Sequence, residues 1–146
     1  METPSKWVEP YREEHGKCLV TGYEHFIDWS QVVPGMAFTG LAKTCGLTPE
    51  VLGVAGLSPL WNGVAQAWVV VGLGVKKHRF FLHRNVLKYL DILAKTHSFR
   101  RIQATVPCFS HNNLSWIESL GFELESELKG FGPDGKDHFM YRKMYD

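Results

Sequence analysis

The order of apolar and polar residues predicts alternating strands and helices after the first 35 positions. Segments 36–46 and 51–61 are rich in small and β-branched residues and are bounded by turn residues, which is typical of strands. Segment 63–75 contains Trp68 and a run of valines, which predicts a central strand covered on both faces. The first 35 residues show no clear period, and we expect short helices and loops there.

From about Arg79 the period changes. Apolar residues recur at three- to four-residue steps between Leu82 and Leu93, with charged residues between them, which predicts an amphipathic helix. Segment 101–107 then alternates apolar and polar residues and predicts a strand that Pro107 ends.

A second helix and a hairpin are predicted near the end of the chain. The helix would begin at Asn112 or Asn113, either of which could cap it, and would end at Gly121 in a left-handed conformation. Segment 122–128 alternates apolar residues with glutamates and predicts a strand with a solvated face. Turn residues at 133–135 and a further alternating segment predict the hairpin.

Composition places the chain in one compact domain, residues 1–146, of α/β (α+β) class, because 45% of its 146 residues are hydrophobic and 21% are charged. A net charge of +1 argues against a nucleic-acid partner. The widely spaced Cys18, Cys45 and Cys108 indicate reduced thiols in a cytoplasm. No apolar run is long enough to cross a bilayer, so we expect a soluble protein without a membrane partner.

A basic loop precedes the first long helix. Lys76, Lys77, His78 and Arg79 follow one another without an acid. A helix N-terminus attracts anions and repels cations, so this charge is tolerable if a phosphate offsets it. The alternative is a set of solvated side chains over an ordinary helix start. The segment matches neither a P-loop nor a dinucleotide fingerprint.

In this order the segments resemble the GCN5-related N-acetyltransferase (GNAT) fold, particularly divergent acetyltransferase-like proteins encoded by bacteriophages. The resemblance rests on VLGVAGLSPLWNGVAQAWVVV, KKHRFFLHRNVLKYLDIL, RRIQATV, SWIESLGFELE and GPDGKDHFMY. It implies a mixed, mostly antiparallel central sheet flanked by helices, with a C-terminal β-hairpin.

The resemblance also implies acetyl-CoA as cosubstrate. Backbone groups of Val69 and Val71 would bind the pantetheine arm. The pyrophosphate would lie on the loop formed by Lys76, Lys77, His78, Arg79 and Phe80. The family's loop is rich in glycine, which lets the backbone close on phosphate, whereas this loop has none. Phe80 and Phe81 could block the site, although they are more simply core residues of the helix start.

The residues for proton transfer also depart from the family. Many members place a glutamate on the strand before the loop, where this chain has Gln66, an amide that can orient water but cannot take its proton. A tyrosine that often serves as acid is replaced by Ile117. Ser110 and His111 are further candidates near the reacting centre. Alternatively, Ser110 caps a helix and His111 satisfies a backbone group.

Other side chains have two interpretations each. Glu123, Glu125 and Glu127 form either a solvated face or an acidic rim that attracts a cationic acceptor. Trp61 and Trp68 are most simply packing residues, although an exposed Trp61 could line an acceptor site. The histidines lack metal-binding spacing, so we expect no metal.

The sequence therefore predicts two alternative functions. The first is an acetyl-CoA-dependent transferase that acetylates an amine of a protein or small molecule. The second is a catalytically inactive GNAT-like binding protein of a phage, either a virion morphogenesis component or an inhibitor of a host protein. A phage protein would lie in the host cytoplasm. The exposed C-terminal hairpin could pair two copies into a homodimer.

Overall fold

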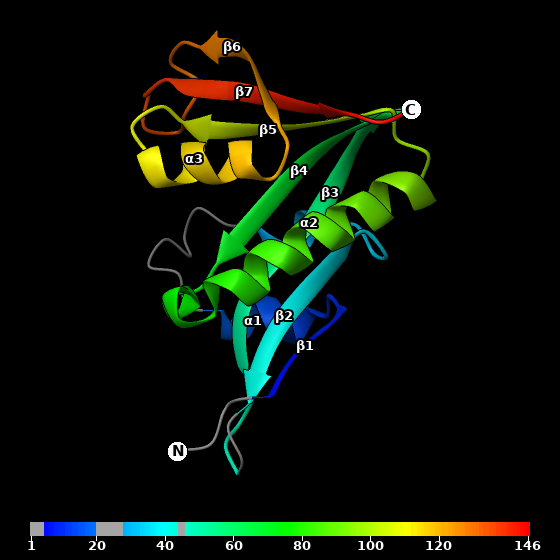
Figure 1. Ribbon diagram of the computed structural model, residues 1–146, viewed down its shortest axis with the longest axis vertical. Helices are drawn as coiled ribbons and strands as arrows, with labels where there is room; N and C mark the ends of the chain where they lie inside the picture. The colour runs from blue at the N-terminus through cyan, green and yellow to red at the C-terminus, as the bar shows by residue number, and fades with distance from the viewer. Residues whose placement is uncertain (1–4, 20–27, 44–45) are drawn as a thin grey trace. The chain divides into compact units, whose positions relative to one another are not determined.

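The computed structural model describes residues 5–19, 28–43 and 46–146. Its elements follow the predicted order over most of the chain (Figure 1). They are β1 Ser5–Pro10, α1 Glu13–Cys18, η2 Trp29–Gln31, β2 Ala37–Lys43, β3 Glu50–Trp61, β4 Val64–Val71, η3 Val75–His78, α2 Arg79–Thr96, β5 Arg101–Pro107, α3 His111–Ser119, β6 Glu123–Leu128 and β7 His138–Met144. Cys45 lies outside the described residues, whereas Cys18 and Cys108 are free thiols.

The predicted fold class is confirmed. Seven strands follow the order β1-β2-β3-β4-β5-β7-β6. The pairs β1–β2, β2–β3, β5–β7 and β6–β7 are antiparallel, and the last of these is the predicted C-terminal hairpin. Strands β4 and β5 are parallel, as expected for strands that a helix connects.

Contacts divide the chain into two compact units. The first unit comprises residues 1–58 and 68–93, and the second comprises 59–67 and 94–146. The assignment of the whole chain, 1–146, to a single domain stays a prediction.

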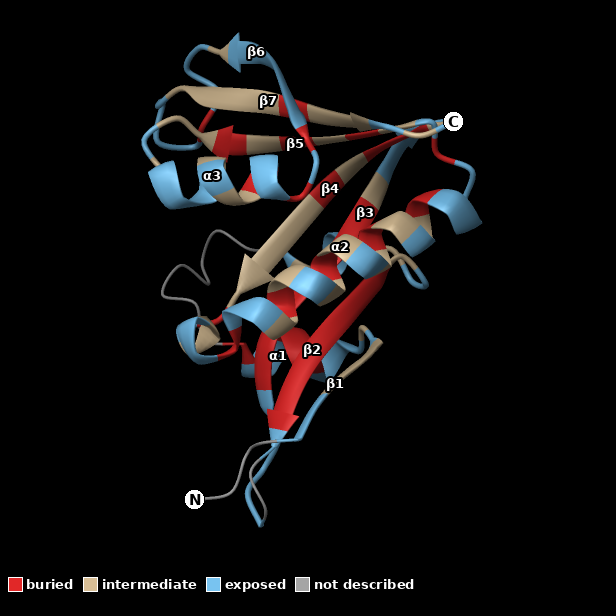
Figure 2. Cartoon of the chain, viewed as in Figure 1, coloured by how far each residue is buried: buried red, intermediate tan, exposed pale blue. Residues whose placement is uncertain are grey.

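In the first unit, both faces of the sheet are covered. On one face, Val69 of β4 and Phe38 of β2 line a small space against Leu82 and Val86 of α2. Figure 2 shows the buried residues of α2 following one side of the helix. The other face carries an apolar cluster with Leu19, Leu41, Val51 and Val54 at its centre and Trp7, Tyr11, Trp29, Trp68 and Val70 around it. The prediction of a strand covered on both faces is therefore confirmed only in part, because residues 68–71 of β4 are half-buried.

The expectation of short helices and loops in the first 35 residues is confirmed for α1 and η2, but it misses a strand. Segment 5–10 is the edge strand β1, which pairs along its whole length with β2, from Ser5 opposite Lys43 to Pro10 opposite Phe38. No residue of β1 is fully buried. A strand without a buried face needs no alternation of apolar and polar residues, so its sequence gives no clear strand signal. Backbone pairing with a distant segment forms this strand, and a local pattern cannot report it.

A buried histidine attaches α1 to this sheet. The Nδ1 atom of His15 accepts the backbone N–H of Arg12 at 3.0 Å and lies 2.8 Å from the Thr39 hydroxyl. Because Nδ1 is an acceptor, the proton is on Nε2, which donates to Glu9 at 2.9 Å. A hydrogen bond from the Trp7 indole lowers the pKa of Glu9. Every polar atom of the His15 ring is therefore satisfied.

The second unit packs α3 against β5. The apolar residues Ile102, Ala104 and Val106 are buried, as is Ile117 of α3. The expected helix end is confirmed, since Gly121 has a φ of +92°.

The predicted caps Asn112 and Asn113 are wrong, whereas the prediction of Ser110 as the cap is right in position, although its side chain makes no capping hydrogen bond. Ser110 occupies the N-cap position, and α3 begins at His111. Instead of capping the helix, the side chain of Asn113 donates to the Ser110 hydroxyl at 2.7 Å.

Strand β6 forms where predicted, but its apolar residues do not form a buried face. Leu124 is 55% exposed. The register against β7 shifts between Leu124 and Ser126, so strict alternation fails inside the strand. Because β6 is also the last strand of the sheet, no other strand of the described chain pairs with its outer edge.

Candidate functional site

The predicted anion loop lies in the first unit, between β4 and α2. After β4 the backbone N–H of Gly72 donates to Leu52 at 2.8 Å, and the single turn η3 then leads into α2. The side chains of Lys76, Lys77 and Arg79 are exposed and form no ion pair with any described acid. We call these three residues the basic entrance. They leave a concentrated positive charge at the start of an 18-residue helix.

His78 differs from its neighbours because it is only 8% exposed. Its Nδ1 atom has no hydrogen-bond partner among the described residues. The sequence suggested another surface cation, whereas the structure places a buried ring nitrogen that a ligand or water could satisfy.

Phe80 does not belong to the core of the helix start, so that interpretation is wrong for this residue. Its side chain is 74% exposed, and the Arg79 guanidinium lies over its ring at 4.9 Å. The interpretation holds for Phe81, which is half-buried and packs against Gly40 of β2.

An acid approaches the loop from elsewhere in the sequence. The carboxylate of Glu50, the first residue of β3, occupies the space into which a side chain at Gly74 would project. A side chain at position 74 would therefore displace the Glu50 carboxylate. No local pattern could identify Glu50, because the contact spans 24 positions of the chain.

Val69 and Val71 end β4, beyond the part of the strand that pairs with β5. The parallel ladder contains only the pairs Val64–Arg101, Ala65–Ile102 and Gln66–Gln103. Among the described residues, β4 makes no further pair with β5. The backbone of β4 after Gln66 is therefore not hydrogen-bonded to β5.

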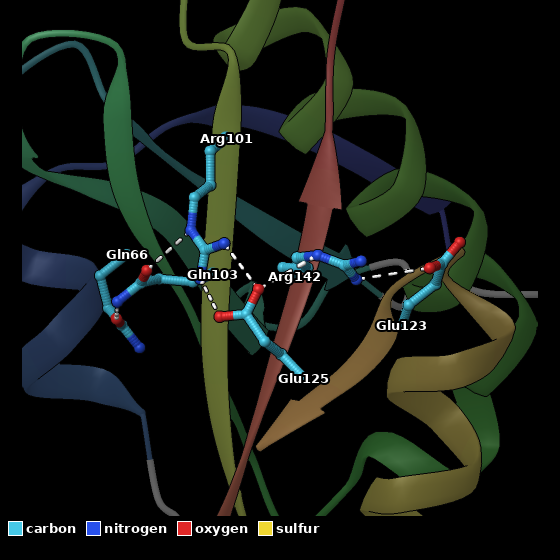
Figure 3. A network of polar contacts seen from close by, with 6 residues as sticks. All are labelled: Gln66, Arg101, Gln103, Glu123, Glu125 and Arg142. Atoms are coloured by element: carbon cyan, nitrogen blue, oxygen red, sulfur yellow. Dashed lines mark hydrogen bonds and ion pairs between the residues drawn. The ribbon is translucent and has the colours of Figure 1, made fainter.

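Gln66 lies at the end of a directed chain of hydrogen bonds in the second unit (Figure 3). The Nε atom of Arg101 donates to the Gln103 carbonyl oxygen at 3.1 Å, and the Gln103 amide nitrogen donates to the Gln66 oxygen at 3.3 Å. A guanidinium can only donate, so it determines which way both amides face. The described contacts leave the Gln66 nitrogen available as a donor.

Arg101 is itself held by Glu125. Two guanidinium nitrogens donate to the two carboxylate oxygens at 2.7 and 2.6 Å. These bonds hold the pKa of Glu125 below its ordinary value. The same carboxylate lies 3.1 Å from Arg142, which also contacts Glu123 at 3.3 Å.

The predicted acidic rim is not supported. Glu123 and Glu125 are paired with arginines, and Glu127 lies 2.8 Å from Lys129. Cations of the chain itself thus neutralise all three charges, which leaves little net field for a cationic acceptor.

Ser110 and His111 stand together at the start of α3. The Ser110 oxygen accepts the Asn113 amide, so its own proton remains available to another acceptor. The exposed His111 ring makes no hydrogen bond within the described chain, so it does not satisfy a backbone group as the simpler interpretation held.

The predicted site residues fall into two groups. Val69, Val71 and the loop 76–80 belong to the first unit, whereas Gln66, Ser110 and His111 belong to the second. In the part of the chain that the structure describes, no three metal-ligating side chains cluster together. None of the described helices is long and apolar enough to cross a membrane.

No protein-family model matches the chain, and a search of curated proteins finds no significant match. Solved structures match along nearly the whole chain. A structure titled NatC complex bound to Gag peptide and CoA has a TM-score of 0.76 and 14% identity, covering 97% of this chain and 99% of its own. Ard1 from Thermoplasma volcanium has a TM-score of 0.73 and 8% identity, with 97% and 98% covered.

A third structure is the ribosomal-protein-S18-alanine N-acetyltransferase from Escherichia coli, with a TM-score of 0.68, 16% identity, and 96% and 94% covered. At such identities the likeness concerns the fold and leaves the activity open. The chain has the fold of the GCN5-related N-acetyltransferases.

Proposed function

We propose that the protein is an acetyl-CoA-dependent N-acetyltransferase that acts on an amine of a small molecule or a protein. The main observation in support of this proposal is the basic entrance. Three exposed cations without an acidic partner stand at a helix start, in a fold shared with N-acetyltransferases, and one matching structure is titled as holding CoA. An anion at this place would offset a charge arrangement that is otherwise unfavourable.

The coenzyme would use the first unit. Its pyrophosphate would lie on Lys76, Lys77 and Arg79, with the free Nδ1 atom of His78 beneath them. The exposed ring of Phe80 would contact the flat or apolar parts of the coenzyme.

The pantetheine arm would bind along β4. Beyond Gln66 the backbone has no pair in β5, so Val69 and Val71 lie on a segment where an extended ligand could add hydrogen bonds.

The transfer itself forms one bond and breaks another. The amine nitrogen bonds to the acetyl carbonyl carbon, the carbon–sulfur bond breaks, and the nitrogen loses a proton while the coenzyme thiolate gains one. Gln66 would donate its N–H to the carbonyl oxygen or to a water, because its own oxygen is occupied by Gln103 and its nitrogen has no partner among the described residues.

An amide cannot take a proton, so the acceptor would react as the neutral amine. The rate should therefore rise with pH toward the pKa of the acceptor. Ser110 has a free hydroxyl proton and His111 an unbonded ring, and either could protonate the departing thiolate.

Calorimetric titration with acetyl-CoA tests the proposal. We expect micromolar binding by the native chain and its loss in Lys76→Ala/Lys77→Ala/Arg79→Ala. A matched control is Arg84→Ala/Lys88→Ala/Lys95→Ala, which removes the same charge from exposed positions further along α2. The control should bind normally. Equal weakening in both variants would contradict a site at the helix start.

The second function would follow if millimolar acetyl-CoA does not bind. The glycine-free loop and the amide at position 66 favour that alternative, a GNAT-like protein that acts by binding another protein. Its phage source, host partner, cytoplasmic location and homodimeric state stay predictions.

A further inference from the structure

The first unit contains a cavity on the face of β4 that does not face α2. It has a volume of about 260 Å³ and is open to solvent. Its lining includes Asp28, Trp29, Gln31, Ser58, Trp68 and Val70. This volume is close to the lower end of the range of small-molecule sites, about 300 Å³. The cavity can hold a compact organic molecule.

Two tryptophans give the cavity aromatic walls. The rings of Trp29 and Trp68 meet edge to face, with centroids 6.4 Å apart. Tyr11 stacks on Trp29 at 5.7 Å and supports that ring. Trp68 packs closely on Gly56, where an added Cβ atom would lie 2.8 Å from the indole. Both walls are held by neighbouring residues, so the cavity presents aromatic surface to an apolar or cationic group.

Among the described residues of the lining, Asp28 is the only charged one. Its Oδ1 atom accepts the Ser30 backbone N–H and hydroxyl at 3.1 and 2.5 Å, and these bonds lower the pKa of the carboxyl group. Its Oδ2 atom has one weaker contact, the Gln31 amide at 3.3 Å. The cavity thus combines tryptophan rings with a single carboxylate oxygen that still has room for a donor.

We propose that this cavity binds an organic cation in which an ammonium group is attached to an aromatic body. The ammonium would bind Oδ2 of Asp28, and the body would lie against Trp29 and Trp68. The site is selective because a neutral analogue of the same shape would leave the carboxylate without a counter-charge.

The proposal becomes more specific if the cavity is the acceptor site, and this step rests on the proposed function. A nitrogen that the carboxylate holds as an ammonium has no lone pair with which to attack a thioester. The acetylated nitrogen must then be a second one. The acceptor class is therefore a molecule with two amino groups separated by an apolar body.

Binding can be measured by calorimetry without coenzyme, using benzylamine, p-xylylenediamine and benzyl alcohol as probes. We expect both amines to bind at least tenfold more tightly than the alcohol. Asp28→Asn should remove this difference while preserving the turn, because asparagine is an equally good N-cap residue. Glu13→Gln removes one acid from an exposed site in the same unit and should change nothing.

Val70→Phe should fill the cavity and weaken all three probes, and a thermal unfolding scan would verify that this variant folds. An alcohol that binds as well as benzylamine, or an Asp28→Asn variant that keeps the preference, would overturn the cation site.

The acceptor step has a separate test. With acetyl-CoA present, p-xylylenediamine should be acetylated and benzylamine should not, and acetylation of benzylamine at a similar rate would overturn the two-amine class. Amine binding without coenzyme binding would contradict the transferase function alone. Coenzyme binding without amine binding would contradict the cavity alone.

Discussion

The chain has two dense groups of charge, the basic entrance at α2 and the glutamates of β6, and the fold treats them differently. Glu123, Glu125 and Glu127 each lie beside an arginine or lysine of the second unit. Lys76, Lys77 and Arg79 have no acidic partner in the described chain. In the sequence the two groups look equivalent, because both are short runs of one sign.

The difference follows from secondary structure. Acids on a strand face the residues of neighbouring strands, and Arg101 and Arg142 are placed there by β5 and β7. Cations at a helix start have no neighbouring strand opposite them, and the helix dipole opposes them. A charge that the fold leaves unbalanced is the better indication of a binding site.

Reversing the charge of the basic entrance should have the largest effect. Each charge-assisted contact contributes about 1.5 kcal/mol, so Lys76→Glu/Lys77→Glu should weaken acetyl-CoA binding by roughly 100-fold or more. The same reversal on the other group, Glu123→Lys/Glu127→Lys, should leave coenzyme affinity unchanged. Calorimetry of both variants would measure the contrast, and similar losses would mean that only net charge matters.

Removing Glu125 should destabilise the protein more than removing Glu127. Glu125 accepts two short bonds from Arg101 and one contact from Arg142, whereas Glu127 faces only the exposed Lys129. Thermal unfolding should therefore give a lower midpoint for Glu125→Gln than for Glu127→Gln. Equal midpoints would indicate that the arginine contacts of Glu125 contribute no more to stability than the lysine contact of Glu127.

Acid should weaken the ion pairs that Glu125 makes with Arg101 and Arg142, and it should leave the basic entrance unaffected. The pKa of Glu125 is lowered in the folded chain, chiefly by its bond from Arg101, so its stabilising contribution is complete above the ordinary value of 4.5. It is lost as the pH falls from 4.5 through the lower folded pKa. In urea unfolding between pH 6 and 3, the free energy of unfolding should fall less steeply with decreasing pH in Glu125→Gln than in the native chain. In Lys76→Ala/Lys77→Ala it should fall as steeply as in the native chain.

The smallest effect concerns the stability of the ligand-free basic entrance. Without an anion, each lysine at the helix start opposes the macrodipole, which costs about 0.3–1 kcal/mol. Lys76→Ala/Lys77→Ala should therefore raise the free energy of unfolding slightly in low salt, while Lys88→Ala/Lys95→Ala should not. Denaturant titrations at low and high salt would measure the gain, and saturating acetyl-CoA should reverse it.

Most of the candidate site residues could be named from the sequence, but several of their roles could not. The loop 76–80 was identifiable because its charge and the following helical period are local. The amide of Gln66 was visible as well, yet its orientation depends on Arg101 and Gln103, which lie more than 30 positions away. His78 looked like a surface cation, and only packing makes it a buried ring.

Sequence patterns alone predict the order of elements after residue 35, the C-terminal hairpin and the place where positive charge accumulates. These follow from apolar periods, turn residues and local charge, which act over a few positions, whereas the mixed sheet was implied by the resemblance to the GNAT fold. The tertiary structure alone decided the edge strand β1, the pairing of the three glutamates and the cavity between Trp29 and Trp68. Apart from the contact between Glu127 and Lys129, each of these brings together residues more than 15 positions apart, and such contacts form only when the chain packs.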